Sequence, residues 1–114
     1  MSDLARERCS ACEPGAPAVT GEERAQLLER LPGWTVRDEN GVPVLVRLFV
    51  CADFAAALRF ANAIGAMADA EDHHPRLVVE WGRVEVSWWT HTIDGLHRND
   101  FILAARTDAL AQTL

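Results

Sequence analysis

The fold is decided by residues 44–68, which read VLVRLFVCADFAAALRFANAIGAMA. From Val44 to Val50 the side chains fall into two alternating sets, as they do on the two faces of a strand. Asp53 is a favourable N-cap, and the apolar residues after it recur at helical spacing. The many alanines favour close packing on a sheet or against another helix. We expect this helix to present one continuous apolar stripe, made of Phe54, Ala57, Leu58, Ala61, Ile64 and Ala68.

Further elements are predicted on both sides of this stretch. Thr20-Gly-Glu-Glu23 fits a capping box, so a helix is expected to start there and to end at Pro32-Gly33. Asn40-Gly41 favours a hairpin turn between two strands. The expected strands are 34–37, 44–50, 77–81 and 83–92, and a last helix is expected at 99–112.

The order of these elements is helix, two strands, helix, two strands, helix. Paired strands joined by short turns run antiparallel. The sequence therefore predicts an α+β fold of two layers, a four-stranded antiparallel sheet with three helices on one face (α-β-β-α-β-β-α). Such a sheet leaves an edge uncovered, and self-pairing into a homo-oligomer, a dimer or a tetramer, would cover it. In the last strand we expect Val84, Val86 and Trp88 on one face and Glu85, Ser87, Trp89 and His91 on the other.

Length and composition describe an ordinary globular protein. The chain has 114 residues, of which 49% are hydrophobic and 25% charged, so we expect an irregular N-terminal arm (1–18) and one domain (19–114). The net charge of −6 argues against binding nucleic acid through its phosphates. The longest apolar stretch, 60–68, is too short for a membrane span, and the first residues do not resemble a signal peptide. We therefore expect a cytoplasmic protein without a membrane partner.

Missing residue types exclude several kinds of chemistry. All 11 basic residues are arginines, so neither a Schiff-base lysine nor a P-loop is present. The chain has no tyrosine, and its glycines form no dinucleotide-binding fingerprint. Four histidines and the carboxylates remain as the groups that can move protons.

Three cysteines, Cys9, Cys12 and Cys51, are an odd number in an apparently cytosolic chain, so a disulfide framework is not expected. Cys9-x-x-Cys12 has the spacing of half a zinc site, but no second pair follows. The alternative is two thiols on the N-terminal arm. Cys51 follows an apolar run and is expected to be a small core residue.

Three of the histidines, His73, His74 and His91, lie close together in the sequence. A hairpin returns to its own start, so His91 at the end of one strand is expected near His73 and His74 at the start of the other. Asp100, in the first turn of the last helix, could orient an imidazole of this cluster. Three alternatives remain on spacing alone: a catalytic cluster, a zinc or iron site, and unrelated surface histidines.

A longer pattern distinguishes these alternatives. The segment Asp69-Ala-Glu-Asp-His-His-Pro75, followed by Trp81, His91 and Asp100, resembles the signature of the pterin-4a-carbinolamine dehydratase family. The run 88–108 and the Leu31-Pro-Gly-Trp34 segment are similar to bacterial members in particular. The resemblance covers roughly residues 9–112, and no position of the motif departs from it.

The resemblance implies an activity and a set of site residues. Family members dehydrate 4a-hydroxytetrahydrobiopterin to a quinonoid dihydropterin, which recycles the pterin of aromatic amino acid hydroxylases. It implies no cofactor and no metal. His73 and His91 would act as acid and base, His74 would orient the pterin, and Asp100 would orient a histidine, His91 by preference. The catalytic set is thus His73, His74, His91 and Asp100, and the substrate-binding set is His73, His74, Pro75, Thr90, His91, Thr92 and Ile93.

The remaining expectations concern partners and the other large side chains. The resemblance implies a pterin substrate and a functional link to phenylalanine hydroxylase. Animal relatives also serve as dimerisation cofactors for a transcription factor, and carboxysome-associated relatives resemble RuBisCO assembly factors. A non-catalytic interaction protein is therefore the alternative to catalysis. Trp81, Trp88 and Trp89 are expected mainly to pack in the core or an interface, with a wall of the pocket as the alternative for one of them. His97 is expected to be exposed at a helix start.

Overall fold

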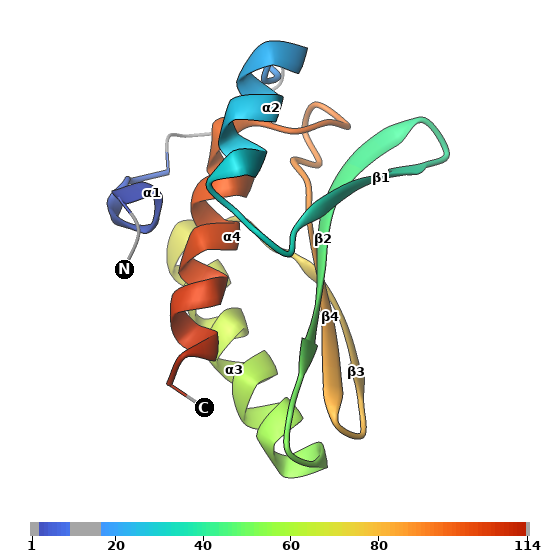
Figure 1. Cartoon of the computed structure of the whole chain (residues 1–114), viewed down its shortest axis with the longest axis vertical. Coiled ribbons are helices and arrows are strands. Elements are labelled where there is room, and N and C mark those ends of the chain that lie inside the picture. The colour runs from blue at the N-terminus through green and yellow to red at the C-terminus, as the bar shows by residue number, and fades with distance from the viewer. Residues whose placement is uncertain (1–2, 10–16, 114) are drawn as a thin grey trace.

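The computed structural model describes residues 3–9 and 17–113, in which helices pack against a single sheet (Figure 1). The helices and strands, in chain order, are α1 (Asp3–Arg6), α2 (Gly21–Glu29), β1 (Thr35–Glu39), β2 (Val42–Val50), α3 (Phe54–Glu71), β3 (Arg76–Glu80), β4 (Arg83–Trp88) and α4 (Arg98–Ala111).

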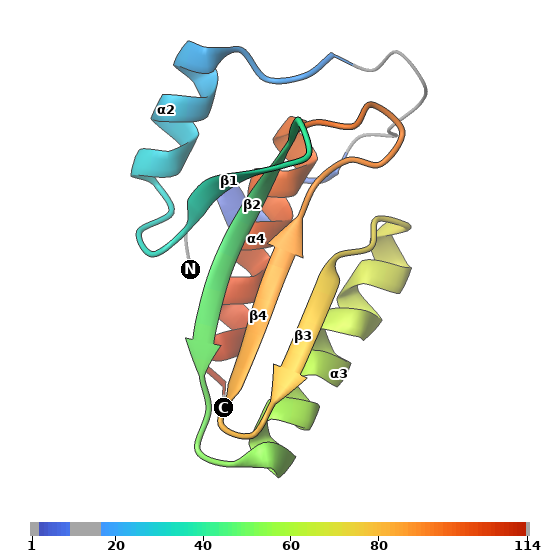
Figure 2. The ribbon, with the colours of Figure 1, turned by 90° about the vertical axis from the view of Figure 1, so that its right-hand side faces the viewer.

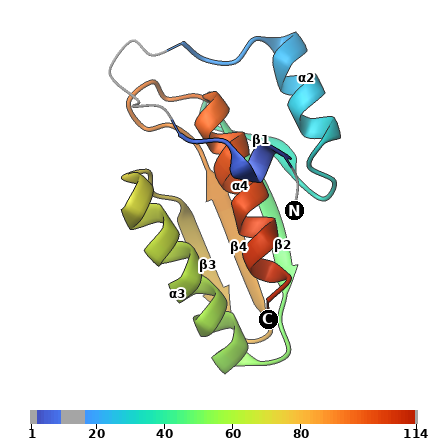
Figure 3. The same ribbon diagram turned by 90° about the vertical axis from the view of Figure 1, so that its left-hand side faces the viewer.

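The four strands form one antiparallel sheet in the order β1-β2-β4-β3, which leaves β1 and β3 as its edges. The helices lie on one face of this sheet (Figure 1), and the opposite face, which we call the open face, is seen in Figure 2. From the helix side, α3 and α4 run along the sheet next to each other (Figure 3). The predicted α+β class is confirmed, with one helix, α1, in addition to the three expected.

Local sequence signals account for the turns and helix starts. Asn40 and Gly41, between β1 and β2, have φ angles of 55° and 87°, as a tight hairpin turn requires. Thr20 caps α2 by accepting a hydrogen bond from the backbone N–H of Glu23 at 3.1 Å. Asp53 caps α3 in the same way, accepting from the backbone N–H of Ala56 at 2.8 Å. These predicted signals are confirmed.

The apolar stripe of α3 is narrower than predicted. Ala57, Phe60, Ile64 and Ala68 are buried at helical spacing, whereas Phe54 and Leu58 are 44% and 42% exposed. Phe54 and Leu58 are one helical turn apart on the edge of the stripe, and the buried row instead runs through Phe60. The predicted apolar stripe is therefore buried along only part of its width, and Phe54 and Leu58 remain partly in contact with solvent.

The core lies between the helices and the inner face of the central strands. Val84, Val86 and Trp88 of β4 are fully buried, as their alternation predicted. They pack in one cluster with Phe60 of α3 and Phe101 of α4. Burying a side chain of this size contributes about 1.5–3 kcal/mol, so this cluster fixes α3 and α4 on the sheet.

The N-terminal segment is more ordered than the sequence indicated. In place of a wholly irregular arm, residues 3–6 form α1, whose Leu4 is fully buried. Arg106 of α4 donates hydrogen bonds to the backbone oxygens of Ala5 and Glu7. The sequence pattern missed this helix because four residues are too few to show a period. Cys12 lies outside the described residues.

Strand β4 ends earlier than predicted, at Trp88 instead of Thr92. After Trp88 the chain leaves the sheet, and the backbone N–H of Thr90 donates to the carbonyl oxygen of Gly95 at 2.8 Å. This local turn satisfies backbone groups that would otherwise pair with a neighbouring strand. Residues 89–95 are therefore free of the sheet register, and they carry one side of the site.

Candidate functional site

The first two histidines follow the C-terminus of α3. Asp72 ends this helix in the left-handed conformation, with φ of 49°, and the backbone N–H of His73 returns to the carbonyl oxygen of Ala68 at 3.2 Å. The chain is then extended before Pro75. Consecutive residues of an extended chain point in opposite directions, and here His73 is buried while His74 is exposed.

The third histidine lies beyond the end of β4. His91 is exposed, and its imidazole stacks on the indole of Trp89, with 4.5 Å between ring centroids and 16° between ring planes. Between them in the sequence, Thr90 is 1% exposed. Trp89 and His91 thus keep the outward side that strand alternation predicted, and Thr90 points inward.

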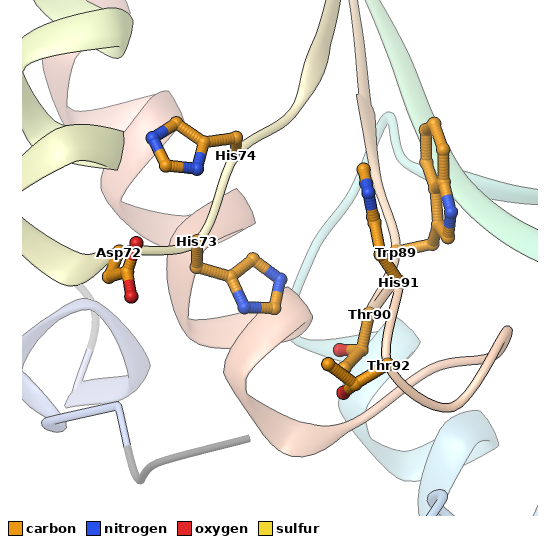
Figure 4. A pocket seen from close by; sticks show the side chains of 7 residues that line it. All are labelled: Asp72, His73, His74, Trp89, Thr90, His91 and Thr92. Carbon is orange, nitrogen blue, oxygen red and sulfur yellow. The ribbon is translucent and has the colours of Figure 1, made fainter. Parts of the chain in front are cut away.

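These segments enclose one pocket of about 170 Å³, seen in Figure 4. One side, the His73 wall, consists of Asp72, His73 and His74. The other, the His91 wall, consists of residues 89–92. The structure therefore brings His73, His74 and His91 together, with Thr90 and Thr92 beside them. Pro75 and Ile93, two other predicted binding residues, are not among the residues that line it.

Asp100 lies behind the His73 wall, fully buried. Its Oδ1 is 2.7 Å from Nε2 of His73. Its Oδ2 accepts a hydrogen bond from the hydroxyl of Thr90 at 2.7 Å and another from the backbone N–H of His97 at 2.9 Å. A carboxylate only accepts hydrogen bonds, so Nε2 of His73 carries the proton and Nδ1 is left for exchange with a ligand.

The expectation that Asp100 orients His91 was wrong, since it contacts His73 instead. The reason is that His91 and Asp100 lie on opposite sides of the sheet. His91 continues the outward set of β4, whereas α4, which carries Asp100, packs on the inward side. From residues 89–92, it is the inward-pointing Thr90 whose hydroxyl bonds the Asp100 carboxylate.

His97 was expected to be exposed, and this was also wrong. It is 9% exposed and serves as the N-cap of α4, where its Nδ1 accepts from the backbone N–H of Asn99 at 3.0 Å. Asp100 completes the capping box by accepting from the backbone N–H of His97. The spacing His97-x-x-Asp100 is that of a capping box, so the sequence held a signal for this arrangement.

The remaining site residues lie at the rim. Nε2 of His74 is 2.9 Å from Oδ1 of Asp69, and both side chains are exposed. Of the three tryptophans in question, Trp88 is fully buried, with its indole N–H donating to the hydroxyl of Thr107 at 3.1 Å. Trp89 lines the pocket, and Trp81 is 71% exposed. Core packing is thus found for Trp88, but not for Trp81.

Cys9 and Cys51 are not among the residues that line this pocket. Cys51 is a free thiol, and both Cys9 and Cys51 pack partly buried against the core. Burial raises the pKa of the Cys51 thiol. Among residues 3–9 and 17–113, no three histidine, cysteine or carboxylate side chains gather as a metal ion would require. Within the same residues no helix combines the length and apolar character needed to cross a lipid bilayer.

Comparison with known proteins agrees with the geometry. The model of the family described as pterin 4 alpha carbinolamine dehydratase matches residues 17–110. A protein of Chlorobium luteolum, named as a pterin-4-alpha-carbinolamine dehydratase, is 46% identical over 114 residues, the whole of both chains.

Two solved structures are similar in fold. A transcriptional coactivator/pterin dehydratase from Brucella melitensis superposes with a TM-score of 0.75 at 29% identity, over 83% of this chain and 99% of the other. A pterin dehydratase-like protein identified as a RuBisCO assembly factor in the alpha-carboxysome gives a TM-score of 0.59 at 25% identity, over 69% of this chain and 89% of the other. From the family match and the full-length identity it follows that this chain belongs to the pterin-4a-carbinolamine dehydratase family of hydro-lyases.

Proposed function

We propose that this chain dehydrates 4a-hydroxytetrahydrobiopterin to quinonoid dihydropterin and water by histidine general acid/base catalysis. The observation that carries the proposal is one pocket lined by His73, His74 and His91, with Asp100 bonded to the back of His73. Family membership supports the dehydratase activity itself. The proposal adds the residues and their roles.

The reaction needs one proton delivered and one removed. Hydroxide is a poor leaving group, so the oxygen on C4a must be protonated as the C–O bond breaks. The electrons that expel it come from N5, which loses its own proton. An imidazole titrates near neutral pH and serves either purpose, and a positioned proton transfer typically accelerates a reaction ~10²–10⁴-fold.

His73 is the more firmly held of the two proton-transfer groups. The Asp100 carboxylate at Nε2 fixes the tautomer and the ring orientation and stabilises positive charge on the ring when Nδ1 takes a proton. His91, on the other wall, serves as the second group, close to solvent with which it exchanges protons. Because the two walls face the same pocket, a pterin between them has an acid and a base within reach.

Binding falls to the residues around these two. His74, at the rim and bonded to Asp69, orients the pterin. Thr90, Thr92, Pro75 and Ile93 complete the proposed binding set. Thr90 acts through Asp100, to which its hydroxyl donates, and Thr92 lines the pocket directly. No cofactor is part of the proposal.

The wider setting belongs to the same proposal. Recycling the pterin links this chain to an aromatic amino acid hydroxylase, such as phenylalanine hydroxylase. The place of action is the cytoplasm, where a free thiol such as that of Cys51 persists. Pairing at the edge strands β1 or β3 makes the chain a homo-oligomer.

The test measures the dehydration of synthetic 4a-carbinolamine by the purified chain, followed by the absorbance of quinonoid dihydropterin. We expect His73→Ala and His91→Ala each to lower turnover about 10²-fold, and the double variant to approach the uncatalysed rate. Circular dichroism and urea unfolding of each variant verify that it is folded. If the double variant dehydrated the substrate as fast as the wild type, the assigned roles would be wrong.

A further inference from the structure

A network of charged side chains crosses the open face of the sheet. Arg76 at the start of β3 makes a two-pronged contact with Glu39 at the end of β1, with N···O distances of 2.8 and 2.7 Å. Glu39 also accepts from Nε of Arg37 at 3.0 Å, and Arg37 donates to Glu85 of β4 at 3.1 Å. The first and last strands of the sheet are thus joined over the two strands between them.

This network restricts the Arg76 side chain. Its Nη2 also lies 3.4 Å from the Ser87 hydroxyl, the residue paired with Arg76 in the β3–β4 register. Beneath it, Ser87 and Val46 are 1% and 7% exposed although α3 and α4 are on the opposite face. The pKa of the Glu39 carboxyl is lowered to about 2, chiefly because Arg76 donates hydrogen bonds to it. Glu39 therefore stays charged, and the guanidinium keeps its partner, at any neutral pH.

The held guanidinium reaches the wall of the pocket. The central carbon of the Arg76 guanidinium lies 5.3 Å from the centroid of the Trp89 ring, a cation–π distance. Trp89 in turn is the ring on which His91 stacks, at 4.5 Å. In Figure 4 the His91 imidazole stands between this indole and the side of the pocket formed by His73 and His74.

His91 needs such support because of where it lies. It follows the end of β4, in a segment held by a local turn rather than by strand pairing. Its ring is exposed, and the buried Asp100 carboxylate is bonded to His73. An exposed side chain without packing samples several rotamers, and misplacing a reacting group by about 1 Å costs up to 10²-fold in rate.

We infer that Arg76, clamped by Glu39, is a positioning residue that holds the Trp89 indole, and through it the His91 imidazole, against the pocket. The inference rests on the proposed catalytic role of His91. Arginine suits this task because its planar guanidinium can bond a carboxylate with two N–H groups and lie over an aromatic ring. Arg76 is not among the residues that line the pocket, and in this inference it acts on the reaction through its contact with Trp89.

The test combines a spectroscopic readout with kinetics. An imidazole stacked on an indole has C–H resonances displaced by the ring current, and His91 is assigned among only four histidines by comparison with His91→Ala. We expect Arg76→Met to move the His91 resonance toward its unstacked position and Trp89→Leu to move it fully. With the carbinolamine substrate, Arg76→Met should lower kcat roughly 5- to 10-fold with KM nearly unchanged. Arg76→Lys keeps the charge but loses the paired N–H groups of the guanidinium, so its kcat and its His91 resonance should lie between those of the wild type and Arg76→Met.

The matched control is Arg83→Met, on the open face near the other end of β4. Arg83 also pairs with a glutamate, Glu80, at 3.2 Å, and it is opposite Val50 in the β2–β4 register. It should leave both the His91 resonance and kcat as in the wild type. The urea unfolding midpoints of Arg76→Met and Arg83→Met are compared. Similar midpoints mean that a lower kcat in Arg76→Met does not come from the loss of stability that follows removal of an ion pair from this face.

Three results would overturn the inference, and they differ. If Arg76→Met left the His91 resonance and kcat unchanged while His91→Ala lost turnover, Arg76 would have no positioning role and the proposed function would stand. If Arg76→Met moved the resonance but His91→Ala turned over like the wild type, the premise that His91 is catalytic would fail. A fall in kcat with no movement of the His91 resonance would also contradict the inference that Arg76 acts on His91 through Trp89.

Discussion

The two walls of the pocket hold their histidines by different physical means. On the His73 wall, Asp100 bonds the ring from a fully buried position that also ties in Thr90 and the start of α4. On the His91 wall, support comes from an aromatic stack at the surface. Buried, satisfied hydrogen bonds are strong because water does not compete with them, whereas surface contacts are individually weak. The comparison teaches that one histidine is held by buried hydrogen bonds and the other by an aromatic contact at the surface.

The largest effect is expected from Asp100→Ala, which breaks the His73 wall. It leaves three hydrogen-bond donors without an acceptor in the interior, so the free energy of unfolding should fall by about 3 kcal/mol. Turnover should fall about as far as in His73→Ala, since the ring loses its orientation. Urea unfolding and the dehydratase assay measure the two losses. Asp100→Asn keeps the volume and should recover only a minor part of either, because the amide turns an N–H toward a donor. Wild-type stability in Asp100→Ala would contradict a buried role.

His74→Ala sharpens the comparison within the His73 wall, since His74 is exposed where its neighbour is buried. Losing one binding contact should raise KM about tenfold, equivalent to ~1.4 kcal/mol, with kcat within about twofold of the wild type. Steady-state kinetics separate the two parameters. Asp69→Ala, which removes only the partner of His74, is the matched control and should raise KM less. A kcat loss as large as that of His73→Ala would assign His74 to proton transfer instead.

His97→Ala tests whether the N-cap of α4 can be removed without disturbing the neighbouring hydrogen bond between His73 and Asp100. Removing an N-cap should cost about 1 kcal/mol of unfolding free energy, and turnover should change far less than in Asp100→Ala. His97→Asn should restore the stability, because asparagine is a preferred N-cap. Urea unfolding of the two variants is the measurement, and equal stability of His97→Ala and the wild type would argue against the capping role seen at Nδ1.

The smallest effect is expected on the stability of the chain in acid. It concerns Glu39, the partner of the Arg76 side chain that contacts Trp89 of the His91 wall. The pKa of Glu39 is about 2 in the folded chain and about 4.3 for an unperturbed glutamate. A lowered pKa gives stability that is present above about pH 4.3 and is lost as the pH falls toward about 2. Glu39→Gln should therefore flatten the decline of the melting temperature in this window, modestly, because the pair is partly exposed. Melting curves recorded every half pH unit measure it, and parallel profiles for variant and wild type would contradict the assignment.

Local features of the fold could be predicted from the sequence. The turn at Asn40-Gly41 and the N-caps Thr20 and Asp53 depend on residues within one turn of the chain. The alternation in β4, which buries Val84 and Trp88, is a period of two that survives any tertiary arrangement. The narrowed stripe of α3 escaped prediction because the width of a helix contact depends on its neighbours.

The candidate site was only partly predictable. The proximity of His91 to His73 followed from hairpin geometry, and the pocket contains both. The partner of Asp100 was missed because it depends on which side of β4 the last helix covers. The buried state of His97 was missed although its capping-box spacing was present. The support of Trp89 by Arg76 joins residues that no motif connects.

Apart from α1, the sequence by itself determined the kinds of element, their order and the family to which the chain belongs, because caps, turns and periodic apolar residues act over a few positions. Only the tertiary structure decided which groups touch. Asp100 and His73 are 27 residues apart and Glu39 and Arg76 are 37 apart, and such pairs meet only once strand order and helix packing are set. The physical reason is that a hydrogen bond acts within about 3 Å, so its partner is chosen by the fold as a whole.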